Sequence, residues 1–359
     1  MKKPFAVAAC LLAAALVSSA ALGEDQAQLQ KRFAEYATRT IDASRISHRQ
    51  FIGGVNNRLT VVHEMACENP DDPDGPWNTA VYDPVDRLWV GGIGVGARQK
   101  DAGGYSGYKF NAYGLNTGYD WSKGDLTVGI AAAYTFGKIK NNDFDAKNKV
   151  ETVNFGVYAS HDPLCGLFYD MNAGYGMSWN RALSSTVAEG AGYREGRFKA
   201  TSYGLGGNIG YGFDLRLAKI TPTIGFQWTR YNQDSYTESA GGAATANWFD
   251  EAKNDFIEIP LAVRIGTSWQ TAGGAVLSPE VRAAYIYQAG DRRSSVTMGT
   301  LGGPGYTLHG VDNGKNRGLV GGGLKANFNA TMDAFVDYSL EFRSGYKSSN
   351  FNTGVGVSF

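Results

Sequence analysis

Charged side chains recur at alternate positions of extended segments, where they need water or an ionic partner. Seven carboxylates share this pattern: Asp120, Asp170, Asp214, Glu258, Glu280, Asp337 and Glu341. Upstream, the segment 39–58 carries four arginines against a single acid, Asp42; they are Arg39, Arg45, Arg49 and Arg58. Burying such charges is costly unless they pair. The chemistry these residues predict is therefore ion pairing between a basic segment and an acidic wall.

Residues that could support enzyme chemistry are sparse. The four histidines are His48, His63, His161 and His309. None lies on a predicted strand beside an outward-facing or rim serine, and a nucleophile needs a base within reach. No metal-ligand spacing occurs, and the glycine-rich segments do not precede helices as nucleotide-binding loops do. We therefore expect no enzyme activity, no bound metal and no cofactor.

The element that must position the charges is a repeated extended strand, shown most clearly by residues 349–359. Phe351, Val355, Val357 and Phe359 alternate there with small or polar residues. Side chains of a strand switch faces at every residue, so one face is apolar and the other polar. Such a strand suits a closed barrel in a bilayer, apolar outside and wet inside.

The same pattern predicts eleven further strands. Their ranges are 87–98, 109–121, 125–137, 149–161, 166–179, 198–215, 219–231, 254–269, 275–289, 316–328 and 332–343. Short turns follow every second strand, and most other connections are longer, as in outer-membrane barrels whose short turns face the periplasm. The predicted fold class is an all-β membrane protein, a 12-stranded antiparallel transmembrane β-barrel.

Glycines on the predicted inner face indicate that a segment passes through the barrel. In the first strand the pattern places apolar residues outward and glycines inward: Trp89, Ile93 and Val95 against Gly92, Gly94 and Gly96. Glycine in a strand often marks the close approach of another backbone. The basic helix 40–64 is the candidate for the threaded segment, and Gly53 and Gly54 should loosen or kink it.

Four regions follow one another along the chain. Residues 1–23 resemble a secretory signal, with two lysines before an apolar core and small residues. Residues 24–64 are rich in helix formers at helical spacing and form the pre-barrel segment. Residues 65–86 form a periplasmic linker rich in Pro and Asp. Residues 87–359 form the barrel, and their many Gly and Tyr suit a large closed sheet.

The chain resembles the translocator domain of autotransporters, the type V secretion proteins, over roughly residues 45–359. The resemblance rests on FIGGVNNRL at 51–59, YGLNTGYD at 113–120, LSPEVRAAY at 277–285, EFRSGY at 341–346 and the terminal Phe359. It implies a twelve-stranded barrel whose lumen holds the helix that joins it to a secreted passenger. It also implies insertion into the bacterial outer membrane by the barrel assembly machinery, which reads the strand ending at Phe359.

The resemblance further implies a site of self-cleavage. Some autotransporters cut their chain between two asparagines inside the barrel, with nearby acids orienting the amide, and Asn56-Asn57 is such a pair here. The alternative is that both asparagines simply belong to a polar luminal helix.

Two cysteines remain once Cys10 leaves with the signal. An even number in an oxidising compartment favours a disulfide, here between Cys67 and Cys165. Both positions fall on the periplasmic side of the predicted topology, so the bond would tether the lower end of the helix to the barrel. Two free thiols are the alternative.

The function we expect is that of a structural or translocator barrel closed by its own helix, without a large passenger, because only a short segment precedes the luminal helix. The alternatives are a pore or a surface adhesin acting through loops 232–253 and 290–315, and an outer-membrane hydrolase. Expected partners are outer-membrane lipid, lipopolysaccharide and the assembly machinery. The zero formal net charge indicates no nucleic acid partner, and we expect a monomer.

Overall fold

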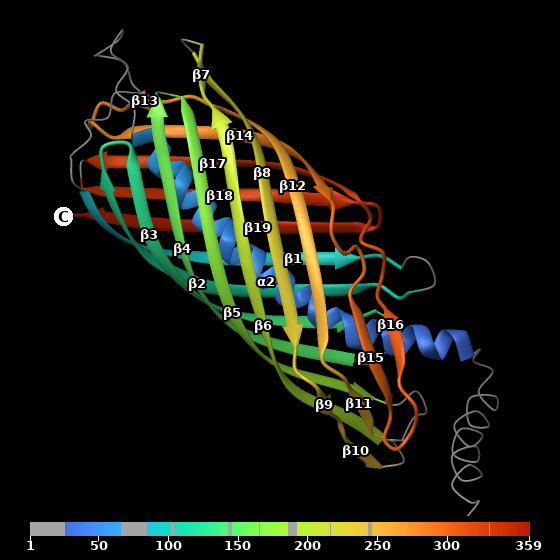
Figure 1. The fold of residues 1–359 in the computed structure, drawn as a ribbon. Helices are drawn as coiled ribbons and strands as arrows, with labels where there is room; N and C mark the ends of the chain where they lie inside the picture. Colours follow the sequence, from blue (N-terminus) through green and yellow to red (C-terminus); the bar gives the residue numbers. More distant parts are fainter. Residues whose placement is uncertain are drawn as a thin grey trace, which may run out of the picture.

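The computed structural model describes residues 26–65 and 85–359, apart from 102–104, 143–145, 165, 186–191, 216, 243–245 and 330. Twelve long antiparallel strands form a closed barrel around the helix α2 (Gln26–Met65) (Figure 1). The predicted fold class is confirmed. The predicted signal 1–23 and most of the linker 65–86 lie outside the described residues.

Each strand of the barrel is bonded to two neighbours. The strands are β1 (Val85–Gln99), β2 (Tyr108–Lys123), β3 (Leu126–Asn141), β4 (Ala146–Leu164), β5 (Leu167–Ser185), β6 (Gly192–Tyr211), β8 (Lys219–Gln233), β12 (Ala252–Gly266), β14 (Val276–Gln288), β17 (Asn316–Asn329), β18 (Met332–Arg343) and β19 (Tyr346–Ser358). Pairing of β1 with β19 and of β6 with β8 closes the ring. Closure leaves no strand edge for lipid to meet. Two short pieces, β7 (Phe213–Asp214) and β13 (Trp269–Gln270), extend it at the short-turn end.

A second sheet covers the long-loop end. It pairs β9 (Tyr236–Thr237), β11 (Asn247–Phe249), β15 (Ser295–Thr300) and β16 (Tyr306–His309) in the order β16-β15-β11-β9. Separately, β10 (Ser239–Gly242) pairs with the first residues of β6. We call the four-stranded sheet the cap. It lies beside the N-terminal half of α2 (Figure 1). The segments 232–253 and 290–315, which the sequence suggested were loops, therefore contain short paired strands.

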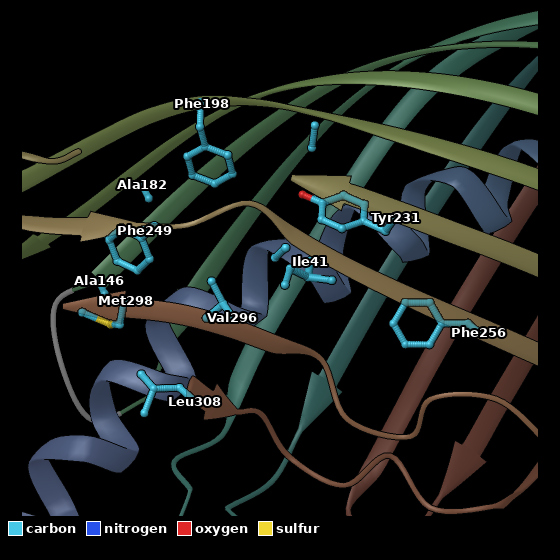
Figure 2. Close-up of a cluster of buried hydrophobic side chains, with 12 residues drawn as sticks. Ile41, Ala146, Ala182, Phe198, Tyr231, Phe249, Phe256, Val296, Met298 and Leu308 are labelled. Atoms are coloured by element: carbon cyan, nitrogen blue, oxygen red, sulfur yellow. The ribbon is translucent and has the colours of Figure 1, made fainter. Parts of the chain in front are cut away.

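A buried apolar cluster joins the cap to the helix. Ile41 of α2 packs with Phe249, Val296, Met298 and Leu308 of the cap (Figure 2). The Tyr236 ring stacks between Phe198 and Phe249, with centroid distances of 4.2 Å and 4.4 Å. Burial of this much apolar and aromatic surface is the main force available to hold the cap in place.

The outward face of the barrel is apolar, with exposed residues such as Tyr113, Leu115 and Phe351. For β1, the sequence pattern predicted the wrong face for each side chain. Trp89 and Ile93 are 1% and 4% exposed and point into the lumen, so Gly92, Gly94 and Gly96 face outward. The reason is that α2 brings apolar side chains into the lumen, and the inner face of β1 packs against them.

α2 runs as one helix of 40 residues through Gly53 and Gly54; the loosening or kink predicted at these two glycines stays a prediction. Within the described residues, no helix is long and apolar enough to cross a membrane.

Candidate functional site

The lumen and the helix inside it form the candidate site, and Arg58 makes its most buried ionic contact. The Arg58 side chain donates to Asp120 Oδ2 of β2 at 2.8 Å and to Asp333 Oδ2 of β18 at 2.8 Å, with neither arginine nor Asp120 exposed. Tyr158 also donates to Asp120, and Trp89 Nε1 donates to Tyr158 Oη at 2.9 Å. These residues hold the C-terminal part of α2 at the short-turn end.

Nine residues earlier in the helix, Arg49 completes a ring of alternating charges. Its Nη2 lies 2.7 Å from Glu341 of β18, and its Nε lies 3.4 Å from Glu258 of β12. Arg317 of β17 contacts the same two carboxylates, Glu341 at 3.0 Å and Glu258 at 2.8 Å. Two arginines and two glutamates thus neutralise one another, which is the condition for burying them.

The opposite side of α2 packs on glycines. His48 is fully buried, with its Nδ1 2.9 Å from Asn154 Oδ1. A Cβ at Gly204 of β6 would lie 2.5 Å from His48 Nε2, and one at Gly174 of β5 would lie 3.1 Å from His48 Cε1. These glycines therefore make room for the imidazole.

The helix thus contacts two unlike walls. On the β3–β5 side it packs through a cluster that includes Phe51, Ile52, Val55 and Leu59. Toward β12 and β18 it reaches the wall through arginines and an asparagine. Apolar packing is non-directional, whereas charge-assisted contacts fix geometry. Together they can define both the depth and the rotation of α2.

The remaining luminal residues predicted on the helix have different surroundings. The Arg45 guanidinium lies over the Phe256 ring, 4.4 Å from its centroid, and its Nε and Nη1 find no hydrogen-bond partner in the described part of the chain. Arg45 is buried but bridges no acidic side chain there.

Asn56 and Asn57 face different partners. Asn172 Nδ2 donates to Asn56 Oδ1 at 3.3 Å, and Asn57 Nδ2 donates to Asp337 Oδ1 at 3.3 Å. Only the second asparagine contacts a carboxylate among the hydrogen bonds described. Cleavage between them stays a prediction, which the intact mass of the mature protein tests.

The predicted acidic wall is only partly directed at the helix. Glu280 binds Lys325 of the barrel at 2.8 Å, and Asp170 is buried on β5. The prediction that Asp214 belongs to the inner wall is wrong. Asp214 is exposed in β7, beyond the end of β6 at Tyr211, and does not line the lumen. The alternation that placed it inward continues past the rim of the barrel.

Several residues of the site escaped the sequence analysis. Asp333 is separated from Asp337 and Glu341 by an even number of residues on β18, so all three lie on the same face and the alternation could have identified it. Arg317 likewise lies on the same face of β17 as Lys325. For His48 and Tyr158 no sequence signal existed, because their roles depend on what the helix meets in space.

Three further sequence predictions concern residues with no tested role. Phe359 is exposed, and its backbone N–H donates to the Asp86 carbonyl at 3.0 Å; its use as an assembly signal stays a prediction. Cys67 and Cys165 lie outside the described residues, so the disulfide between them also stays a prediction. The described residues contain no group of three or more His, Cys, Asp or Glu that could hold a metal ion.

Gly54 should tolerate a side chain less well than its neighbour Gly53. A Cβ at Gly54 would lie 2.5 Å from Asn116 Nδ2, whereas one at Gly53 would meet nothing within 4 Å. Gly53→Ala should stabilise the protein, since alanine favours the helix by up to about 1 kcal/mol. Gly54→Ala gains the same propensity but must displace a buried asparagine, so its unfolding temperature should fall below that of Gly53→Ala. Thermal unfolding followed by circular dichroism tests this, and equal values would contradict the close approach.

A closed twelve-stranded barrel that holds an N-terminal helix defines the class of translocator-type barrels of the bacterial outer membrane, a class of structural and transport domains. The chain belongs to the autotransporter family: the model described as "Autotransporter beta-domain" matches residues 88–339. The predicted family and the predicted location in the outer membrane are confirmed.

Among curated proteins the chain is similar to "Outer membrane protein A" of Rickettsia conorii (strain ATCC VR-613 / Malish 7). The two are 26% identical over 331 residues, which cover 88% of this chain and 16% of that protein. "Probable outer membrane protein pmp21" of Chlamydia pneumoniae is 20% identical over 284 residues, or 76% of this chain and 17% of that protein. The chain thus spans only about a sixth of the length of these relatives.

Solved structures of other autotransporter domains share the fold. The "Translocator domain of autotransporter NalP from Neisseria meningitidis" aligns with a TM-score of 0.66 at 17% identity, covering 90% of this chain and 99% of that one. The "transport unit of the autotransporter AIDA-I from Escherichia coli" aligns with a TM-score of 0.57 at 15% identity, covering 86% and 98%.

Proposed function

We propose that this barrel is the export unit of a type V secretion protein and that α2 closes its lumen. The solved structures that share its fold are described as a translocator domain and a transport unit. The observation that carries the proposal is the course of α2 through the lumen, with Arg49 and Arg58 each bound to carboxylates on two different strands.

The cap supports the same role. Its apolar side packs on α2 around Ile41, and Ser294, just before β15, donates to Asp42 Oδ1 at 2.8 Å. A Cβ at Gly310, just after β16, would lie 2.6 Å from Thr38 Oγ1, so the backbone there is close to the helix. These contacts favour a closing function for segments 232–253 and 290–315 over the alternative of free adhesive loops.

Deleting residues 26–65 should open the barrel. We expect the full chain to conduct poorly in planar bilayers and the deleted form to show large, stepwise currents, because ions can then cross a wet lumen. Adding the 26–65 peptide back should reduce the current. Circular dichroism and the mobility of the unheated protein in detergent gels verify that the barrel has folded.

Two results would contradict the proposal. The first is a folded barrel whose conductance is the same with and without the helix. The second is a full-length protein that is already open, since α2 would then lie in the lumen without closing it.

A further inference from the structure

Five cationic side chains face one another across neighbouring strands at the long-loop end of the barrel. The strand register pairs Lys347 with Arg98, Arg98 with Lys109, Lys109 with Lys140, and Lys140 with Lys147. All five are exposed. We call them the cation row; it crosses β19, β1, β2, β3 and β4.

Such a row is unfavourable unless something neutralises it. Side chains directly opposite on adjacent strands are about 5 Å apart, and like charges there repel. Elsewhere the barrel solves this problem internally: Arg181 and Arg197 also face each other, and Glu195 bridges both, at 3.0 Å and 2.5 Å.

Most residues of the cation row have no neighbouring carboxylate that bridges them as Glu195 bridges the two arginines. Among the described residues, no carboxylate lies within 4.0 Å of Arg98, Lys109, Lys140 or Lys347 (the salt bridges found there involve other residues). Four cations in direct succession thus lack a carboxylate partner from the part of the chain that the structure describes.

The row lies just above the apolar belt of the barrel. On β2, Lys109 precedes the exposed Tyr113 by four residues, and on β19 Lys347 precedes the exposed Phe351 by four. Four residues span about 13 Å along a strand, or about 10 Å of depth at the usual tilt of a barrel strand. The row therefore falls at the level of lipid head groups in the outer leaflet.

We propose that the cation row binds the phosphate groups of lipopolysaccharide in the outer leaflet. Lys and Arg are the side chains that recognise phosphate. Four strand spacings of about 4.8 Å make the row about 19 Å long, which accommodates more than one phosphate of the same glycolipid. The aromatic and aliphatic surface directly below it accommodates the acyl chains, and this favours a lipid over free phosphate.

Removing two central charges tests the site. In detergent-solubilised full chain, Lys109→Gln/Lys140→Gln should bind phosphorylated lipid A roughly 10- to 30-fold more weakly than wild type, because each cation near an anionic lipid surface contributes about a factor of five. Dephosphorylated lipid A should bind wild type as weakly as the phosphorylated form binds the variant. Isothermal titration measures these affinities.

Lys199→Gln/Lys253→Gln is the matched control. Both residues are exposed, and the register places Trp179 opposite Lys199 and Asn232 opposite Lys253, so neither faces another cation. The control should keep its affinity, and an equal loss would reduce the effect to bulk charge and overturn the site. Inorganic phosphate that competes as well as lipid A would overturn the lipid as ligand.

The stability of the lipid-free variant separates binding from a structural role. Without lipid, Lys109→Gln/Lys140→Gln should unfold at the same or a higher temperature than wild type, because a like-charge contact is removed. A lower unfolding temperature would show that the lysines stabilise the barrel itself, and would overturn the proposal.

Discussion

Arg58→Met should free the C-terminal part of α2 from the barrel wall. The substitution leaves Asp120 and Asp333 buried without a counter-charge, and breaking one side of a buried ion pair typically costs about 3–5 kcal/mol. The ratio of closed to open barrels should then fall by roughly two to four orders of magnitude. Single-channel recording measures this directly as the fraction of time that the pore conducts.

Two further variants give this experiment its controls. Arg181→Met removes an arginine whose ion pair with Glu195 is on the surface, and it should leave the open fraction unchanged. Adding Asp120→Asn and Asp333→Asn to Arg58→Met removes the uncompensated charges and should restore much of the closed state. Failure of this restoration would show that packing of the arginine, rather than charge, holds the helix.

Gly204→Val should also displace the helix, through the opposite wall. The first added carbon would lie 2.5 Å from the fully buried His48 ring, and the two methyl groups need further space. Overpacking of this kind costs about 1–3 kcal/mol, and occasionally more. We expect a lower unfolding temperature together with a larger open fraction in bilayers.

Gly94→Val is the matched control for this prediction. Gly94 is also a strand glycine, but it faces outward, and an added Cβ there meets nothing closer than Phe351 Cβ at 4.0 Å. Valine favours strands, so this variant should be as stable as wild type and remain closed. If both valine variants opened the pore equally, the contact with His48 would not be the cause.

The strand pattern predicted most of the barrel because lipid imposes a strict alternation on every strand. The range predicted for β18, residues 332–343, agrees with the structure, since a short turn limits it at each end. Trp89 and Ile93 of β1 were placed on the wrong face because the rule assumes a wet lumen. Where α2 supplies apolar partners such as Phe51, the inner face of a strand is apolar too.

The cap could not be predicted for a different reason. Its strands are only two to six residues long, too short for a periodic signal. β11 pairs with β15, which lies about fifty residues away, as in the register of Phe249 with Met298. Contacts of such separation depend on the closed barrel that brings both loops together. For α2, the sequence predicted that its arginines pair with carboxylates of the barrel wall. It could not predict which residues pair, because that depends on how far the helix extends into the lumen.

Ile41 belongs to the helix and, at the same time, to the apolar cluster of the cap. Thermodynamic linkage is reciprocal, so whatever stabilises the folded cap also stabilises the helix in its place, by the same free energy. Backbone amides of β11 and β15 should therefore exchange with solvent faster whenever α2 is absent. The stability of the cap should therefore depend on whether the helix occupies the lumen, and a molecule that bound only the folded cap would also stabilise the helix in its place.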